Sequence, residues 1–262
     1  MTTAFEHASP PVLNIDNGVA TITLNRRARR NRLENGDLKV LLGHFESLNR
    51  DQDVRVLVLT ANTAGHPKPV FCAGYDIGGF DEPGHGAIFF EEIPDALAEL
   101  RPVTVCALNG SVYGGATDVV LACDLVLAQQ GMAWRMPACA IGLHYYASGL
   151  QRYVQKMGLS LSQRAFLLGT AMPFEQLQAC GMFHALVSES QFEDHLHQLV
   201  QQVLGLAPGA VQATKQSLLD VAEGMPDIAA VQAREASSQS SADFAEGRLA
   251  MQERRKPVFQ GR

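Results

Sequence analysis

The segment LNGSVYGGATDVVLACD, residues 108–124, decides the fold of this chain. It follows Val103–Leu108, a short apolar run rich in β-branched residues, which predicts a buried strand. A loop with three glycines comes next, Ala116–Ala122 predicts a helix, and Asp124–Ala128 predicts another strand. A strand, helix and strand in this order are typical of an α/β protein with a mainly parallel sheet.

The N-terminal part of the chain fits the same fold class. Val12–Ile15 and Val19–Leu24 flank Asp16-Asn17-Gly18, and Asn-Gly supplies the positive φ angles that a tight β-hairpin needs. Further elements are expected at Leu38–Leu48 (helix), Val54–Leu59 (buried strand), 61–88 (a long loop rich in Gly and Pro) and Phe89–Leu100 (helix).

Beyond Ser160 the pattern becomes helical throughout. Helices are expected at Ser160–Leu168, Pro173–Cys180, Gln191–Leu204, Ala210–Ala222 and Asp227–Gln252. Ser190 and Glu193 have the spacing of a capping box at the start of one of them. We therefore expect an α/β core over residues 1–190 and a helical region over residues 191–262.

Composition excludes several classes of protein. The chain has 262 residues, of which 47% are hydrophobic and 18% charged, so neither a disordered chain nor a coiled coil is expected. A net charge of −6 disfavours nucleic acid as a partner. No apolar run approaches the ~20 residues of a membrane-spanning helix, so no membrane partner is expected.

Cysteine and histidine usage predicts a cytoplasmic protein without a metal site. The five cysteines are odd in number and include no CxxC pair, which favours reduced thiols. The first twelve residues lack the basic flank and apolar stretch of a signal peptide, so a cytoplasmic location is expected. The eight histidines are scattered and include no HExxH motif.

Two glycine-bearing loops are the candidate site. The first, VFCAGYDI at 70–77, and the second, NGSVYGGATD at 109–118, each follow a buried strand. Glycines let backbone N–H groups approach a ligand closely, and two such groups, one from each loop, would make an oxyanion hole. Tight strand-to-helix turns explain the same glycines equally well.

Several motifs together resemble one family. FCAGYDI at 71–77 and NGSVYGGATDVVLACD at 109–124 are similar to the two signatures of the crotonase superfamily, specifically the enoyl-CoA hydratase/isomerase family. Further similar stretches are LNR at 24–26, LGT at 168–170, DFAEG at 243–247 and ERRKPVF at 253–259. The resemblance spans residues 10 to 261 and implies a crotonase-like ββα spiral core with a helical C-terminal trimerisation region.

The resemblance implies an acyl-CoA thioester as substrate. The family holds the thioester enolate with two backbone N–H groups, which would be those of Tyr75 and Gly115. Coenzyme A is then part of the substrate, and no separate cofactor is expected. The remaining loop positions that the resemblance assigns to substrate binding are Ala73, Gly74, Asp76, Ile77 and Gly114.

The resemblance also implies roles in proton transfer. Asp118 stands where hydratases of the family carry their first catalytic glutamate, although an aspartate in a first helical turn also simply complements the helix dipole. Ala138, after Pro137, stands where the second glutamate is found and cannot move a proton. Water addition in the family uses both carboxylates, so Ala138 removes one of the two groups that hydration needs.

Other side chains are candidates for the missing group. His144, Tyr145 and Tyr146 lie in a segment that lines the acyl pocket of relatives, although the two tyrosines are equally well explained as core aromatics. Glu91 and Glu92 either direct one carboxylate inward or form a solvated face. The predicted catalytic residues are Asp118, Tyr75, Gly115, His144 and Tyr146.

Basic residues near both ends of the chain are candidates for binding coenzyme A. Five arginines fall within seven positions, Arg26–Arg32, and we expect Arg27 and Arg30 to bind CoA phosphate; salt bridges to acidic residues are the alternative. Relatives assemble as trimers or dimers of trimers. The resemblance therefore implies a homotrimer or hexamer in which Lys256 reaches the CoA of a neighbouring subunit.

The sequence leaves the reaction open. An isomerase- or hydratase-type proton transfer on an enoyl-CoA, with Asp118 as acid and base, is the leading interpretation. Decarboxylation of a malonyl-type thioester needs no base, only a proton donor. A non-catalytic scaffold is the third interpretation; Ala138 favours it, whereas the intact glycine loops and Asp118 argue against it.

Overall fold

The computed structural model describes residues 9–65, 67–78, 88–224 and 226–261. The strands are β1 (Val12–Asp16), β2 (Val19–Leu24), β3 (Val56–Ala61), β4 (Val70–Cys72), β5 (Val103–Leu108), β6 (Ser111–Tyr113), β7 (Leu125–Gln129), β8 (Ala133–Arg135), β9 (Met172–Pro173) and β10 (Ala185–Val187). The helices are α1 (Asn35–Arg50), α2 (Glu92–Ala98), α3 (Ala116–Leu121), α4 (Ala147–Gln163), α5 (Phe174–Gln178), α6 (Glu189–Leu204), α7 (Pro208–Ala222), α8 (Ile228–Gln239) and α9 (Ala242–Glu253). Shorter turns of helix are η1 (Arg27–Arg29), η3 (Ala138–Ile141) and η4 (Arg164–Leu168).

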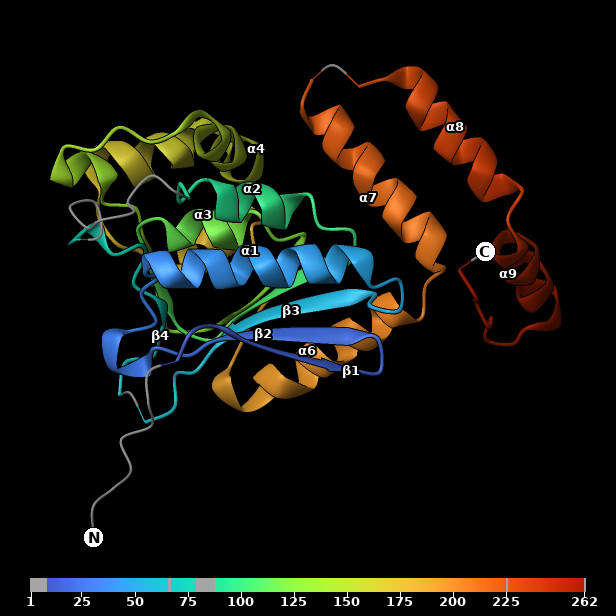
Figure 1. The fold of residues 1–262 in the computed structure, drawn as a ribbon, viewed down its shortest axis with the longest axis horizontal. Helices are drawn as coiled ribbons and strands as arrows, with labels where there is room; N and C mark the ends of the chain where they lie inside the picture. Colours follow the sequence, from blue (N-terminus) through green and yellow to red (C-terminus); the bar gives the residue numbers. More distant parts are fainter. Residues whose placement is uncertain (1–8, 66, 79–87, 225, 262) are drawn as a thin grey trace, which may run out of the picture.

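Two sheets form the centre of the fold. The larger has the order β1-β2-β3-β5-β7-β10, and all its pairs are parallel except the β1–β2 hairpin. The smaller has the order β4-β6-β8-β9, with β4, β6 and β8 parallel. The α/β class and the mainly parallel sheet predicted from the sequence are confirmed (Figure 1). The predicted hairpin is also confirmed, with positive φ angles of 48° at Asn17 and 79° at Gly18.

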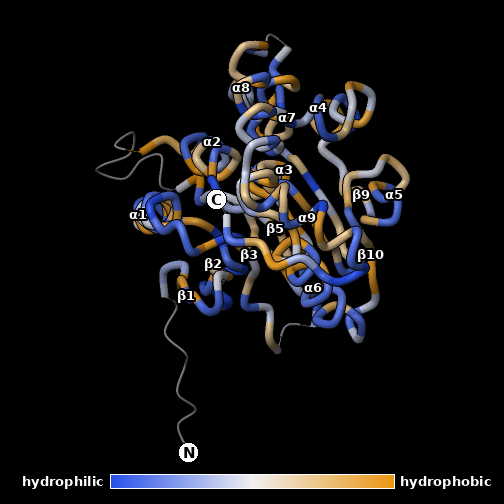
Figure 2. Tube along the Cα trace, turned by 90° about the vertical axis from the view of Figure 1, so that its right-hand side faces the viewer, coloured by the Kyte–Doolittle hydropathy of each residue, from blue (hydrophilic) through white to orange (hydrophobic). Residues whose placement is uncertain are grey.

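The larger sheet separates two apolar clusters. Because successive strand residues point to opposite faces, Leu57 and Leu59 of β3 join the cluster with α1, α2 and α3, whereas Val56 and Val58 join the other. Helix α6 covers that second face with Phe192, Leu199, Val200 and Val203. Figure 2 shows the matching alternation of hydrophobic and hydrophilic residues along α1 and α6.

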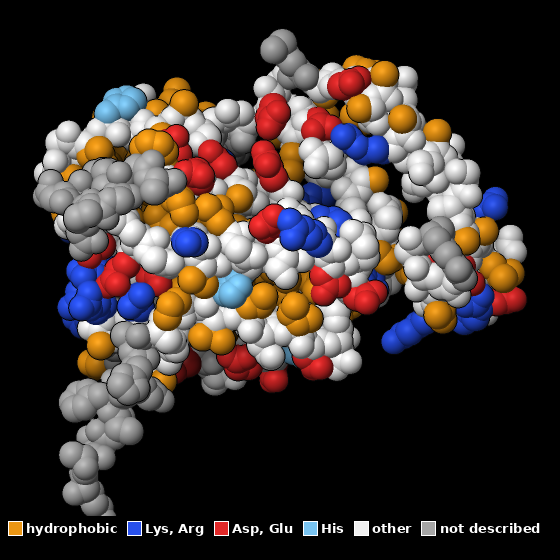
Figure 3. All heavy atoms as spheres, in the orientation of Figure 1, with side chains coloured by type: hydrophobic (Ala, Val, Ile, Leu, Met, Phe, Trp, Pro, Cys, Tyr) orange, Lys and Arg blue, Asp and Glu red, His pale blue; other side chains and the backbone are white. Residues whose placement is uncertain are grey.

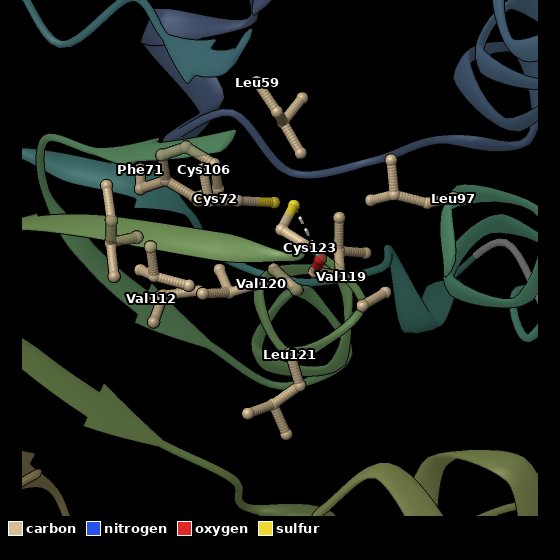
Figure 4. Close-up of a cluster of buried hydrophobic side chains, with 14 of the residues drawn as sticks. Leu59, Phe71, Cys72, Leu97, Cys106, Val112, Val119, Val120, Leu121 and Cys123 are labelled. Atoms are coloured by element: carbon tan, nitrogen blue, oxygen red, sulfur yellow. Dashed lines mark hydrogen bonds between the residues drawn. The ribbon is translucent and has the colours of Figure 1, made fainter. Parts of the chain in front are cut away.

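Three cysteines lie in the first cluster. Cys72, Cys106 and Cys123 pack among Leu59, Val119 and other apolar side chains (Figure 4). Burial raises the pKa of the Cys72 thiol to about 12 and also raises the pKa of Cys106. The thiols of Cys72 and Cys106 are therefore protonated and act as small apolar side chains. All five cysteines are free thiols.

The C-terminal third differs from its sequence prediction in several places. Helix α6 packs on the larger sheet and so belongs to the α/β core, although the helical region was predicted to begin at residue 191. Helices α7, α8 and α9 extend to one side of the core (Figure 1). The single helix predicted over 227–252 is two helices, because the Ser241 hydroxyl accepts from the Phe244 N–H at 3.0 Å and starts α9. The residue before α6 is Ser188, so the capping box predicted at Ser190 is wrong. Helix α4 is interrupted at Gly158, which has a non-helical φ of 74° and ψ of 161°. Its second part continues into η4 and matches the helix predicted at Ser160–Leu168, whereas its first part, from Ala147, was not predicted.

The contact between β4 and the loop before β6 gives a stability prediction. A Cβ on Gly110 would lie 2.6 Å from the backbone nitrogen of Phe71, so Gly110→Ala forces two backbones apart and should lower the free energy of unfolding by about 1–3 kcal/mol. Gly43 in α1 has open space, and Gly43→Ala should raise the same quantity by ~0.5–1 kcal/mol. Urea unfolding of both variants checks this; equal effects at the two sites would contradict it.

Candidate functional site

The two glycine loops border one pocket. Its volume is about 620 Å³, which is within the range of about 300–1,000 Å³ typical of small-molecule sites. The structure brings together eight of the residues predicted from the sequence on its wall: Ala73, Gly74, Tyr75, Ile77, Gly114, Gly115, His144 and Tyr146. Phe89, Phe90 and Tyr113, which were not predicted as site residues, complete much of the aromatic lining.

The loops meet at their glycines. Gly74 has a φ of 98°, and a Cβ there would lie 2.9 Å from the carbonyl oxygen of Tyr113 and 3.4 Å from the backbone nitrogen of Gly115. A Cβ on Gly115 would lie 2.6 Å from the ring of Phe90. Only glycine fits either position without displacement, so the backbones of both loops are adjacent and face the same pocket.

Asp118 lies behind the pocket wall. It is fully buried, and the Arg152 guanidinium forms a two-pronged ion pair with it, Nε to Oδ1 at 2.9 Å and Nη2 to Oδ2 at 2.7 Å. The Tyr146 hydroxyl donates to Oδ2 at 2.5 Å. Asp118 is not among the described residues that line the pocket, and Tyr146, which does line it, is its link to that space.

Tyr145 and Tyr146 form a hydroxyl pair on the pocket wall. Their rings stack with centroids 4.2 Å apart, and the Tyr145 hydroxyl donates to that of Tyr146 at 2.9 Å. Burial and the negative charge of Asp118 raise the pKa of both phenols above the usual value. Both therefore stay protonated at neutral pH, and their protons form a chain from Tyr145 through Tyr146 to Asp118.

Arg152 is the main site residue that sequence reasoning missed. Burial lowers the pKa of its guanidinium, but hydrogen bonds and ion pairs with Asp118 and Asp95 outweigh that effect and raise it. Its Nη1 lies 2.7 Å from Asp95 Oδ1. Arg152 follows Asp118 by 34 positions on a different helix, and no motif in the sequence marks the pair.

The other predicted residues have varied surroundings. The Tyr75 hydroxyl donates to Asn35 at the start of α1. Asp76 forms an ion pair with Arg32 at 2.8 Å and does not line the pocket. Ala138 presents a methyl group to the pocket, and His144 is exposed beside it.

The arginine cluster divides into two groups. Three members are held by acids: Arg26 by Asp37 at 2.7 Å, Arg29 by Glu34 at 2.6 Å, and Arg32 by Asp76. The salt-bridge alternative is thus confirmed for these three, and Figure 3 shows basic and acidic side chains side by side at the edge of the molecule near the start of α1. Arg27 donates to the Ala64 carbonyl at 2.9 Å. The backbone carbonyl oxygen of Arg30 accepts a hydrogen bond from the Ala73 N–H at 3.0 Å, which places Arg30 next to the first loop.

Lys256 is exposed beyond α9, and it is not one of the described residues on the pocket wall. The described residues contain no group of three or more His, Cys, Asp or Glu placed to hold a metal. None of the helices in the described ranges is both long and apolar enough to cross a membrane.

Comparison with known proteins identifies the family. The family model described as enoyl-CoA hydratase/isomerase matches residues 14–262. The chain belongs to the enoyl-CoA hydratase/isomerase family. The resemblance stated from the two glycine loops is therefore confirmed.

Several known proteins are similar to this chain in sequence or in structure. It is 29% identical over 249 residues to 2,3-dehydroadipyl-CoA hydratase of Escherichia coli K12, covering 93% of this chain and 96% of the relative. It is 24% identical over 253 residues to methylmalonyl-CoA decarboxylase of the same organism, covering 94% and 95%. The solved structure of Pseudomonas aeruginosa DspI matches with a TM-score of 0.86 and 26% identity over 99% of this chain and 100% of that one. The crotonase-like fold expected from the resemblance is confirmed.

The buried ion pair gives a second stability prediction. Arg152→Met leaves Asp118 as an unpaired buried charge and should lower the free energy of unfolding by about 3–5 kcal/mol. Combining it with Asp118→Asn removes that charge but keeps an acceptor for Tyr146, so the double variant should recover more than half of the loss. Urea unfolding of the two variants checks this; a double variant no more stable than Arg152→Met alone would contradict it.

Proposed function

We propose that this chain is an acyl-CoA enzyme that holds a thioester enolate between the backbone N–H groups of Tyr75 and Gly115. The observation that carries the proposal is the contact of the two glycine loops at the wall of a pocket of about 620 Å³. Backbone donors fixed in this way stabilise a developing oxyanion, and one such donor is typically worth about 3–4 kcal/mol in the transition state. Membership of the family supports the same substrate class.

We propose an isomerase- or hydratase-type proton transfer on an enoyl-CoA. In this scheme Asp118 acts through Tyr146, because the Tyr146 hydroxyl both lines the pocket and donates to Asp118. For isomerisation, a proton leaves the α-carbon for the Tyr146 oxygen while Tyr146 passes its own proton to Asp118. The reverse transfer delivers a proton to the γ-carbon. One shuttle suffices, so Ala138 is no obstacle to this reaction.

Decarboxylation of a malonyl-type thioester is the second candidate. Loss of carbon dioxide leaves the enolate directly, and the phenols of Tyr145 and Tyr146, both protonated at neutral pH, would donate the proton that quenches it. The similarity to methylmalonyl-CoA decarboxylase supports keeping this candidate.

The proposal includes the residues that bind the coenzyme A phosphates and the oligomeric state of the protein. Arg27 and Arg30 lie in the segment that precedes α1, and we propose that they bind the phosphates; the Arg30 carbonyl accepts from the Ala73 N–H and so adjoins the first loop. An apolar groove of about 960 Å³ runs between α7, α8 and α9, lined by residues such as Phe244, Met251 and Phe259. A homotrimer or a dimer of trimers would cover this groove and place Lys256 near a neighbouring copy. Light scattering of the protein in solution measures that mass, and a monomer would contradict the assembly.

Product analysis decides among the reactions. Incubating the protein with crotonyl-CoA, a 3-enoyl-CoA and methylmalonyl-CoA, followed by mass spectrometry, should give conversion of the 3-enoyl-CoA to its 2-enoyl isomer. Carbon dioxide from methylmalonyl-CoA with no isomerisation would favour the second candidate. If none of these thioesters binds or reacts, the proposed function is wrong and the scaffold interpretation holds.

Substitutions at Tyr146 and Asp118 should lower kcat by different amounts. Tyr146→Phe removes the pocket-facing hydroxyl and should lower kcat at least 100-fold with little change in KM, within the 10²–10⁴ range of acid–base groups. Asp118→Asn keeps an acceptor for Tyr146 and should lower kcat at least tenfold. Tyr75→Phe, which keeps the backbone N–H and removes the hydroxyl that donates to Asn35, is the matched control and should lower kcat less than Tyr146→Phe does. An unchanged kcat in Tyr146→Phe would remove that residue from the mechanism.

A further inference from the structure

The pocket is apolar and lacks a fixed positive charge on its described wall. Four of its apolar side chains remain exposed to solvent: Ile77 at 59%, Phe89 at 56%, Ile141 at 54% and Leu143 at 41%. Among the described residues that line it, none is Lys or Arg, and the acidic Glu91 is present.

Two guanidinium groups close to this wall are already paired with acids. Arg152 bonds to two carboxylates, those of Asp118 and Asp95. Arg32 is held by Asp76 at 2.8 Å. The basic side chain that does line the pocket is His144, which is exposed, and an ion pair in water with an exposed group contributes little.

We infer that the acyl group accepted by this pocket is uncharged at its far end, so that enoyl thioesters ending in a second carboxylate are rejected; the same apolar wall disfavours the malonyl-type thioester of the second candidate reaction. This inference rests on the proposed function, because it concerns the acyl group of the thioester. An ionised carboxylate that leaves water without gaining a partner is strongly disfavoured. Here it would also approach Glu91, and like-charge repulsion adds to the selection against it.

A matched pair of substrates tests the inference. 2-Hexenoyl-CoA and 2,3-dehydroadipyl-CoA have six-carbon acyl chains and differ only in a methyl group against a carboxylate at the far end. The kcat/KM for hydration or for the reverse isomerisation to the 3-enoyl thioester should be at least tenfold higher for 2-hexenoyl-CoA, and a ratio below ten would overturn the inference. The saturated analogues hexanoyl-CoA and adipyl-CoA, measured by titration calorimetry, give the same comparison without any reaction and should differ at least tenfold in Kd.

The calorimetric titrations distinguish failure of the proposed acyl-CoA function from failure of the inferred acyl-group selectivity. Binding of both saturated thioesters with Kd values within tenfold overturns the selectivity and leaves the proposed function intact. Binding of neither overturns the proposed function and the selectivity with it.

A positively charged side chain introduced at the pocket wall tests whether the lack of positive charge causes the selectivity against a carboxylate. Leu143 lines the pocket and is 41% exposed, so a longer polar side chain there can reach solvent without disturbing the core. Leu143→Arg should reduce the preference for 2-hexenoyl-CoA over 2,3-dehydroadipyl-CoA about three- to fivefold, the upper end of what an ion pair with a partly exposed group contributes. Leu143→Gln, polar but uncharged, is the matched control and should reduce it less than twofold. Equal ratios in the two variants would show that charge is not the cause and would overturn the inference.

Discussion

The close approach of two backbones at Gly74 and Gly114-Gly115 is the constraint on which the rest of the site depends. Strands β4 and β6 are parallel neighbours, and they end at Cys72 and Tyr113. Parallel strands that end side by side send their following loops out at the same edge of the sheet. The two loops therefore leave the smaller sheet together, and the absence of side chains at the glycines lets their backbones touch and face the pocket.

A buried polar network lies behind the pocket wall at Tyr146. Asp118 reaches this network because α3 starts directly after the second loop, and Arg152 comes to it from α4. A buried charge of this kind is tolerated only when it is paired, and here the pairing also orients a phenol. One aspartate thus stabilises the helix contact and holds the Tyr146 hydroxyl at the pocket, which is how a fully buried residue takes part in the proposed chemistry.

Local patterns were sufficient to predict the elements closest to the site. Strand β5 occupies the predicted residues 103–108, and α3 follows the second loop as predicted, because apolar runs and glycine turns are local signals. The pocket lining at Tyr75, Gly115 and Tyr146 was predicted through the family motifs.

What the sequence could not supply were contacts between distant elements. Arg152 meets Asp118 only because α4 packs beside α3, and the start of α4 at Ala147 carries no capping side chain that would reveal it. Phe90 closes over Gly115 for the same reason, since α2 and α3 are adjacent only in the folded protein. The helical tail was misjudged where α6 packs on the sheet, because an amphipathic helix does not specify which apolar surface it will cover.

A crystal structure with hexanoyl-CoA bound tests the central claim most directly. The account predicts that the thioester oxygen lies about 2.7–3.1 Å from the backbone nitrogens of both Tyr75 and Gly115. It also predicts that the Tyr146 hydroxyl is the side-chain donor nearest to the α-carbon. A thioester oxygen bound elsewhere, with the two glycine loops unoccupied, would contradict the account.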